Sequence, residues 1–196
     1  MLSMSLQQII KENNIKLGLW KIEESLEELL QLAETASIPN CNTEKRKKEF
    51  LVSRLLLNNI SPNSSITYNK FGAPELDNLQ NISVSHSKGL VAILLGNKKV
   101  GLDIEQISDK PLRLSSKFMA KDVYENLSKE KATLIWCAKE AIYKWYQKGN
   151  INFIKDIKLH NFEIAEKGML TAEFKTERLF LNYQKINNHY LVYVCK

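Results

Sequence analysis

The sequence predicts an α+β protein built from two lobes of similar size that meet near residue 98. Segments with strand-like and with helix-like periodicity occur in both halves, and no close repeat or low-complexity tract is visible. The chain has 196 residues, of which 44% are hydrophobic and 26% charged, so it can bury a proper core. We therefore expect an N-terminal lobe over residues 1–98 and a C-terminal lobe over residues 99–196.

The N-terminal lobe is expected to combine strands with two helices. Apolar alternation predicts a strand over residues 15–22, and leucines at helical spacing predict a helix over residues 23–36 that ends before Pro39-Asn40. A second helix is predicted over about residues 43–59. The remaining predictions in this lobe are a turn over residues 69–74 and a short strand over residues 81–85.

The C-terminal lobe is expected to begin with a hairpin. Residues 90–95 and 99–105 would be its strands, joined through Gly96-Asn97-Lys98. Residues 108–128 are mixed and mostly helical, and they lead into a helix over residues 129–148 with Ser128 as N-cap and Gly149 as C-cap. Four strand-like runs complete the lobe, at residues 157–164, 170–175, 179–185 and 190–195.

Charge and cysteine content narrow the range of functions. The net charge is +6, which favours an anionic partner such as nucleic acid, a phosphorylated ligand or an acidic protein. Three widely spaced cysteines without a CxxC pair argue against a disulfide framework and a zinc ribbon, and they fit a reducing cytoplasm. Residues 1–14 lack the pattern of a signal peptide, and no window resembles a membrane span. We expect a soluble, cytoplasmic protein.

The second predicted helix carries an unusual charge pattern. Lys45, Arg46, Lys47 and Lys48 lie in its first turns, where cations are unfavourable unless a partner compensates them. Arg54 follows two turns after Lys47 on the same face. The segment is either a solvated basic helix or a face that binds an anion.

Two acids alternate with apolar residues in Val100-Gly101-Leu102-Asp103-Ile104-Glu105. A strand would send Asp103 and Glu105 to one face, about 6.6 Å apart. In a cleft both could stay ionised beside a cation, and oxygen ligands at this spacing suit Mg²⁺. The alternative is an edge strand whose acids face water.

The helix over residues 129–148 has two faces. Leu134, Ala138, Ala141, Ile142 and Trp145 recur at core spacing. Trp136, Glu140 and Lys144 form a second stripe, with Lys139 and Tyr143 beside it. This stripe is either a solvated i,i+4 Glu–Lys pair or part of a site.

If this helix packs against the acidic strand, Glu140 adds a third carboxylate, and Lys139 and Lys144 flank a metal with positive charge. A phosphate ester would suit such a site. His86 lies between Ser85 and Ser87 at the end of a strand, where it is either structural or a donor to phosphate.

Three segments in order resemble the motifs of the 4′-phosphopantetheinyl transferases. They are Ser83-Val84-Ser85-His86-Ser87, Gly101-Leu102-Asp103-Ile104-Glu105 and Trp136-Cys137-Ala138-Lys139-Glu140-Ala141-Ile142-Tyr143-Lys144. Chain length and residues 45–54 resemble the monomeric, surfactin-synthetase-activating type. The resemblance covers about residues 43–148 and is weak outside them.

The resemblance implies a monomer of two similar α/β lobes in a pseudo-twofold arrangement, with CoA in the cleft between them. It implies Mg²⁺, with Mn²⁺ as the alternative, held by Asp103, Glu105 and Glu140 with the CoA pyrophosphate. Family members transfer the phosphopantetheine arm of CoA to a serine of an apo acyl or peptidyl carrier protein and release 3′,5′-ADP. Ser85 and His86 would meet CoA phosphates, Arg46 and Arg54 the nucleotide end, and Lys139 and Lys144 the pyrophosphate.

The implied chemistry needs positioning and charge neutralisation, so no nucleophilic side chain is required. Glu140 is hypothesised to take the proton of the carrier serine, directly or through water, and Lys144 to stabilise or protonate the leaving phosphate. Asp103 would act through the metal. Carrier proteins are generally acidic, which fits the basic chain.

Two positions depart from the usual family pattern. Ala73 replaces a lysine that would meet CoA, for which Lys70 could compensate, and Val123 replaces a glutamate, with Asp122 adjacent.

Two other functions remain open, a nucleic-acid-binding protein and a CoA-binding protein without transferase activity. The first is favoured only by charge, because the basic helix has one aromatic residue, Phe50, and the acids would repel a polyanion. We expect no nucleic-acid or membrane partner.

Overall fold

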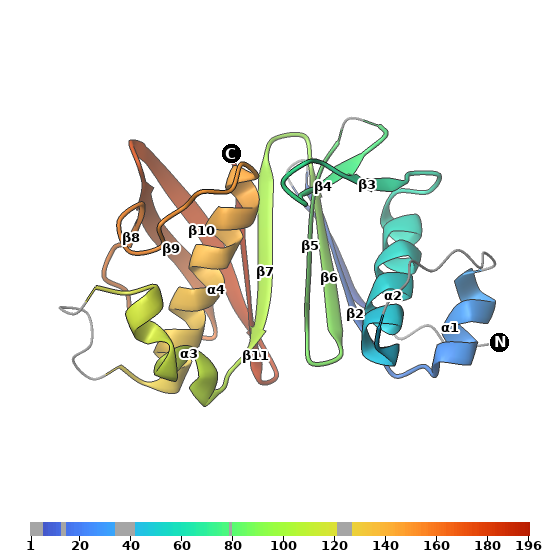
Figure 1. Ribbon diagram of the computed structural model, residues 1–196, viewed down its shortest axis with the longest axis horizontal. Coiled ribbons are helices and arrows are strands. Elements are labelled where there is room, and N and C mark those ends of the chain that lie inside the picture. Colours follow the sequence, from blue (N-terminus) through green and yellow to red (C-terminus); the bar gives the residue numbers. More distant parts are fainter. Residues whose placement is uncertain (1–5, 13–14, 34–41, 79, 121–126) are drawn as a thin grey trace. The chain divides into compact units, whose positions relative to one another are not determined.

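The chain forms two compact units, residues 1–97 and residues 98–196 (Figure 1). The computed structural model describes residues 6–12, 15–33, 42–78, 80–120 and 127–196. Both units combine helices with antiparallel sheets, so the mixed α+β class is confirmed. None of the helices in the described residues is long and apolar enough to cross a membrane.

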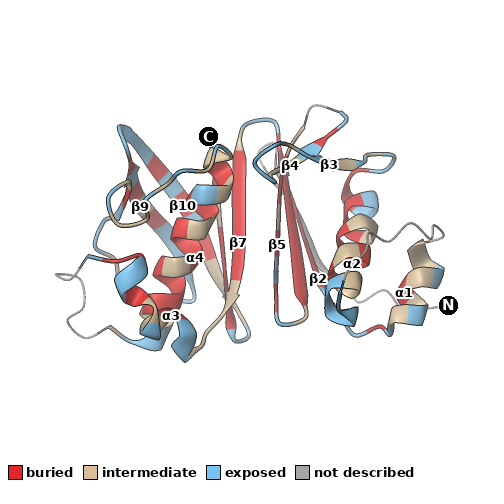
Figure 2. Cartoon of the chain, viewed as in Figure 1, coloured by how far each residue is buried: buried red, intermediate tan, exposed pale blue. Residues whose placement is uncertain are grey.

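The first unit is built on a four-stranded antiparallel sheet in the order β1-β2-β6-β5. Helix α2 packs on β2 and β6, and its apolar residues share one core with Trp20, Val91 and Ile93. Strand β6 is buried along its whole length (Figure 2) and pairs with β2 on one edge and β5 on the other. The elements are β1 Leu6–Glu12, β2 Ile15–Lys21, α1 Leu26–Ala33, α2 Glu44–Ile60, β3 Ile66–Tyr68, β4 Pro74–Leu76, β5 Asn81–Ser87 and β6 Leu90–Gly96.

The strand and helix predictions for this unit hold with shifted ends, but β1, β3 and β4 were not predicted. The chain enters α2 through a cap at Thr43, whose hydroxyl accepts the Arg46 backbone N–H at 3.3 Å. The predicted turn over residues 69–74 joins β3 to β4, and Gly72 supplies its positive φ of 78°.

The expected hairpin across residues 90–105 is wrong. Strand β6 pairs with β5 and β2, whereas β7 (Val100–Gln106) pairs with β11 in another sheet. The hairpin is instead β5–β6, closed by Lys88 and Gly89 at φ of 43° and 84°. Two central residues with positive φ give the turn whose twist matches that of antiparallel strands. Gly96-Asn97-Lys98 therefore joins two units.

The second unit contains a five-stranded antiparallel sheet in the order β7-β11-β10-β9-β8. Helix α4 packs on β7 and β11, and its predicted core residues are all buried. The four predicted C-terminal strands are confirmed with shifted ends. The elements after β7 are α3 Asp109–Arg113, the 3-10 turn η1 Ser115–Lys117, α4 Lys129–Tyr146, β8 Ile157–Leu159, β9 Lys167–Phe174, β10 Glu177–Ile186 and β11 His189–Cys195.

The start of α4 was predicted correctly and its end was not. The Ser128 hydroxyl accepts the Lys131 backbone N–H at 3.1 Å. Gln147 adopts the left-handed conformation, with φ of 62°, and its N–H bonds the Tyr143 carbonyl. The helix therefore ends two residues before the expected cap at Gly149. The positions of Asp122 and Val123 lie outside the described residues, as does Cys41; Cys137 and Cys195 are free thiols.

Candidate functional site

The acidic face of β7 is directed toward α4. Strand alternation puts Gly101, Asp103 and Glu105 on this face, and their contacts on α4 are to Ala141, Lys144 and Trp136. A Cβ atom at position 101 would lie 2.0 Å from the Ala141 carbonyl oxygen and 2.6 Å from the Trp145 backbone nitrogen. Only glycine allows the strand to approach the helix so closely, which brings the carboxylates against the Trp136–Lys144 stripe.

Asp103 is buried and paired with a lysine. Its side chain is 4% exposed, and its Oδ1 accepts a hydrogen bond from the Lys144 ammonium at 2.7 Å. The alternative of an edge strand with both acids in water is therefore wrong for Asp103. The alternative of a solvated Glu140–Lys144 pair is also wrong, because Lys144 pairs across to β7.

Glu105 and Glu140 belong to the same electrostatic cluster. Burial and then the Asp103 charge raise the pKa of Glu105, against a hydrogen bond from Trp136 that lowers it. Burial first, and then the Asp103 and Glu105 charges, raise the pKa of Glu140 to about 7, against the opposing effect of Lys144. Three carboxylates that disfavour each other's charge are thus held together by one strand and one helix.

This donor set fits a hard divalent cation. Mutual repulsion among carboxylates is relieved by a cation with a preference for oxygen, as Mg²⁺ and Mn²⁺ have. Asp103, Glu105 and Glu140 are the side chains that would hold it. Among the residues that the structure describes, no three acidic, histidine or cysteine side chains are already gathered into a metal-ligand arrangement. The Lys144 ammonium donates a hydrogen bond to Asp103, and the Trp136 indole Nε1 donates one to Glu105 Oε1 at 3.1 Å.

Lys139 lies elsewhere. Its ammonium is buried and donates to the backbone carbonyls of Phe153 and Ile157, the latter at 2.7 Å. Burial lowers its pKa to about 8, and no carboxylate contributes to that shift. The structure thus places Lys139 against the segment before β8, whereas the resemblance implies a contact with pyrophosphate.

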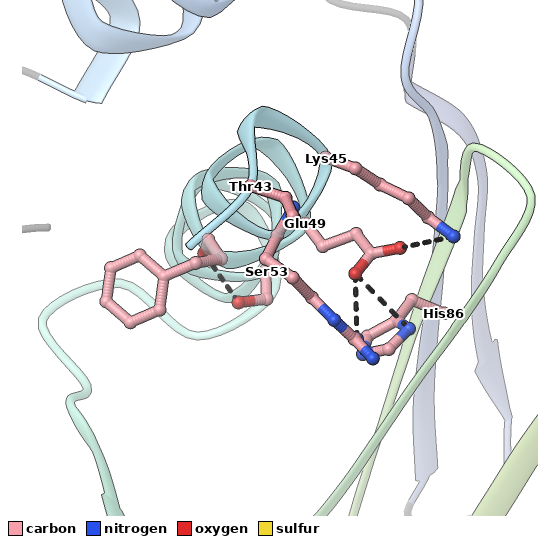
Figure 3. A network of polar contacts seen from close by, with 7 residues as sticks. Thr43, Lys45, Glu49, Ser53 and His86 are labelled. Carbon is pink, nitrogen blue, oxygen red and sulfur yellow. Dashed lines mark hydrogen bonds and ion pairs between the residues drawn. The ribbon is translucent and has the colours of Figure 1, made fainter. Parts of the chain in front are cut away.

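A second polar cluster lies in the first unit, between α2 and β5 (Figure 3). Arg46 Nη1 is 2.9 Å from Glu49 Oε2 and 3.0 Å from His86 Nε2. His86 Nδ1 is 3.6 Å from the same glutamate oxygen, and Lys45 Nζ is 3.7 Å from the other. Since an arginine only donates, His86 Nε2 accepts in this arrangement. Arg46 and His86, which were predicted to meet different parts of CoA, therefore lie side by side.

Glu49 was missed by sequence reasoning. It is 3% exposed and pairs with cations of the basic stretch, while Glu44 pairs with Lys48 at 3.2 Å. These carboxylates compensate the positive charges that would otherwise be unfavourable beside the N-terminus of the helix. The available signal was spacing, because Glu49 follows Lys45 by four residues and Arg46 by three.

Three other residues predicted to contact CoA, or to compensate for a missing contact, lie in the first unit. They are Ser85, Arg54 and Lys70. Ser85 is buried and points to the opposite face of β5 from His86, as strand alternation requires. The Arg54 guanidinium stacks 3.7 Å from the Phe50 ring centroid and lies 5.9 Å from that of Tyr68. Lys70 lies over the exposed Phe71 ring, at 5.1 Å, near Ala73.

Carboxylates with a lysine among them form the kind of site that phosphoryl-transfer enzymes use with a divalent metal. Residues 99–195 match the sequence profile of the 4′-phosphopantetheinyl transferase superfamily. The resemblance is confirmed for these residues.

A relative supports the same family. The 4′-phosphopantetheinyl transferase gsp of Aneurinibacillus migulanus is 28% identical over 140 residues, which cover 66% of this chain and 57% of that protein. The matched region thus spans little more than half the length of this relative.

Proposed function

We propose that the protein transfers the 4′-phosphopantetheine arm of CoA to a serine of an apo acyl or peptidyl carrier protein, with Mg²⁺ or Mn²⁺ as cofactor. The main support for this proposal is the cluster of Asp103, Glu105 and Glu140 with Lys144. These residues lie in motifs that follow one another in the same order as in the family. The products would be the holo carrier protein and 3′,5′-ADP. The proposal includes the monomeric, pseudo-twofold arrangement of lobes that the resemblance implies.

CoA is the proposed source of the transferred group and the ligand of the basic residues. Arg46 and His86, already 3.0 Å apart, are suited to a phosphate because both can present N–H groups to it. Arg54 and its stacked Phe50 would lie at the nucleotide end. Ser85 would also contact a CoA phosphate, from the face of β5 opposite to His86. The proposal assigns no CoA contact to Lys139.

The chain's own residues would act at the reacting atoms as follows. The carrier serine Oγ attacks the phosphorus next to the pantetheine arm, and the bond from that phosphorus to 3′,5′-ADP breaks. A metal bound by the three carboxylates would neutralise phosphate charge. Glu140 takes the serine proton, directly or through water. Lys144 leaves Asp103 and stabilises the leaving phosphate.

The carrier partner is expected to be acidic. The chain has 28 lysines and arginines against 22 acids, so complementary charge would speed encounter and lose strength with salt. We propose neither a nucleic-acid nor a membrane partner.

Intact-protein mass spectrometry tests this function. An apo carrier protein incubated with the protein, CoA and Mg²⁺ should gain one phosphopantetheine arm, and EDTA or a serine-to-alanine carrier should prevent the gain. Glu140→Gln should abolish the gain while CoA binding, measured by calorimetry, changes little. CoA binding without any gain across several carriers would favour a CoA-binding protein without transferase activity.

A further inference from the structure

We propose that Trp136 and Lys139 are positioning residues, which fix the side chain of Glu105 through a chain of contacts that begins at the segment before β8. Neither would touch CoA. The inference rests on the proposed metal-dependent function, since it assigns these residues to the support of one proposed metal ligand.

The chain of contacts begins with an anchored segment. The Lys139 ammonium donates to the carbonyls of Phe153 and Ile157, which are four residues apart. A buried ammonium with two carbonyl partners ties this stretch to α4, because breaking either bond would leave a charge poorly compensated in the interior.

The anchored segment holds an aromatic group in place. Phe153 packs on Trp136, with ring centroids 5.7 Å apart, and on Tyr143, at 5.9 Å. On its other side Trp136 meets Phe118 edge to face, with centroids 5.0 Å apart. Phe118 is fully buried, and its backbone N–H closes the 3-10 turn by bonding to the Ser115 carbonyl at 3.0 Å. The indole is thus wedged between two rings whose backbones are fixed.

The wedged indole reaches the carboxylate cluster. Trp136 Nε1 donates to Glu105 Oε1 at 3.1 Å, from helix to strand. An indole has one donor and no acceptor, so this contact orients the carboxylate without competing for a cation. Such supporting hydrogen bonds set the direction of a metal ligand, and losing one commonly lowers metal affinity about 10–100-fold.

The motif that carries Glu140 would therefore supply both residues of the carboxylate cluster and residues that position them. Glu140 and Lys144 belong to the cluster itself, while Trp136 and Lys139 hold its geometry. The charges that shift the pKa of Glu140 are those of Asp103, Lys144 and Glu105, so the influence of Lys139 would travel through the aromatic contacts.

The decisive experiment is a titration with Mn²⁺ alone, followed by the electron paramagnetic resonance signal of the free hydrated ion. Trp136→Phe keeps the aromatic packing and removes the N–H, and we expect its Kd for Mn²⁺ to rise at least about tenfold. Trp20→Phe is the matched control. It removes an indole–glutamate bond of the same kind, Trp20 Nε1 to Glu24 at 3.2 Å, from the other unit. Its Kd should stay within about twofold of wild type.

A double-mutant cycle tests the route. Lys139→Met should weaken Mn²⁺ binding in the wild type and have little further effect in the Trp136→Phe background, because the contact it supports is already lost. Thermal unfolding is measured beside it, so that affinity is compared only among folded variants. Additive losses would remove Lys139 from the route.

The possible results distinguish failure of the metal site from failure of the positioning role of Trp136. A wild-type chain that binds no Mn²⁺ at the cluster, judged by comparison with Asp103→Asn, overturns the metal site and this inference together. Normal Mn²⁺ binding by Trp136→Phe overturns the inference alone and leaves the proposed function standing.

Discussion

Gly101→Ala is the sharpest test of how the acidic strand meets α4. The added methyl group would lie 2.0 Å from the Ala141 carbonyl oxygen, 2.6 Å from the Trp145 nitrogen and 2.7 Å from the Trp145 Cβ. The first two are backbone atoms of a helix, so no side-chain rotation can make room. Either α4 or β7 has to move.

The size of the effect follows from the gap that is needed. Ordinary contact begins near 3.4 Å, so the oxygen must retreat by about 1.4 Å, the difference from 2.0 Å. Helix α4 is packed against β7 and β11 along buried residues, and displacing it would loosen that core. Overpacking typically costs 1–3 kcal/mol, and backbone contacts place this case at the upper end, about 3 kcal/mol.

Gly18→Ala is the matched control. Gly18 also lies on a strand that faces a helix, but an added Cβ would meet the Leu56 side chain, at 2.8 Å from Cδ1 and 3.2 Å from Cγ. A leucine can change rotamer, so we expect a cost of about 1 kcal/mol. Amide hydrogen exchange is the assay, because it reports opening free energies for β11 and β6 separately. Equal costs for the two substitutions, or a loss below about 1 kcal/mol in β11 for Gly101→Ala, would refute the reasoning.

Three further predictions concern charge. The folded state raises the pKa of Glu140 to about 7 from its ordinary value of 4.5, so the stability that its proton contributes is complete below pH 4.5 and lost as pH rises through 7. Glu140→Gln should therefore raise the melting temperature of the metal-free chain at pH 8, with a gain that vanishes toward pH 4.5; a gain independent of pH would contradict this. Lys144→Met should destabilise the metal-free chain by about 3 kcal/mol in urea unfolding, because the buried Asp103 carboxylate loses its ion pair with the Lys144 ammonium. Saturating Mg²⁺ should restore more stability to this variant than it adds to wild type. Arg46→Met should weaken CoA binding about tenfold by calorimetry, whereas Lys21→Met, which removes an exposed pair with Glu23, should not.

Much of the second unit could be predicted because local pattern and tertiary packing agree there. Apolar spacing located α4 and its core face, and the strand period put Asp103 and Glu105 together. The expected hairpin failed for a physical reason. Strand β6 has a turn at each end, and the sequence pattern alone does not say which turn closes a hairpin. The two-residue turn at Lys88-Gly89 closes one with β5, whereas Gly96-Asn97-Lys98 does not close one with β7.

The first unit shows what a charge pattern alone leaves undecided. A run of four cations left a solvated basic helix and an anion-binding face as alternatives, and Glu49 and Glu44 engage three of these cations, Lys45, Arg46 and Lys48. Burial of Glu49 depends on how α2 packs against the sheet, which helical spacing alone does not reveal. We therefore predict that anion affinity at this face depends on the geometry that Glu49 imposes on Arg46 and His86 more than on the number of cations.

The placement of Lys139 follows from helical spacing once its neighbours are considered. It lies four residues after Ile135 and three before Ile142, both buried, so it belongs to an inward stripe. Trp136, Glu140 and Lys144 lie one turn apart on the adjoining stripe, toward β7. Neighbouring positions 139 and 140 are about 100° apart around the helix, so a lysine and a glutamate that look like one charged pair enter different surroundings. Burial of the lysine stem is favourable only because two carbonyls receive its ammonium, and this requirement couples the segment before β8 to the face that carries the carboxylates.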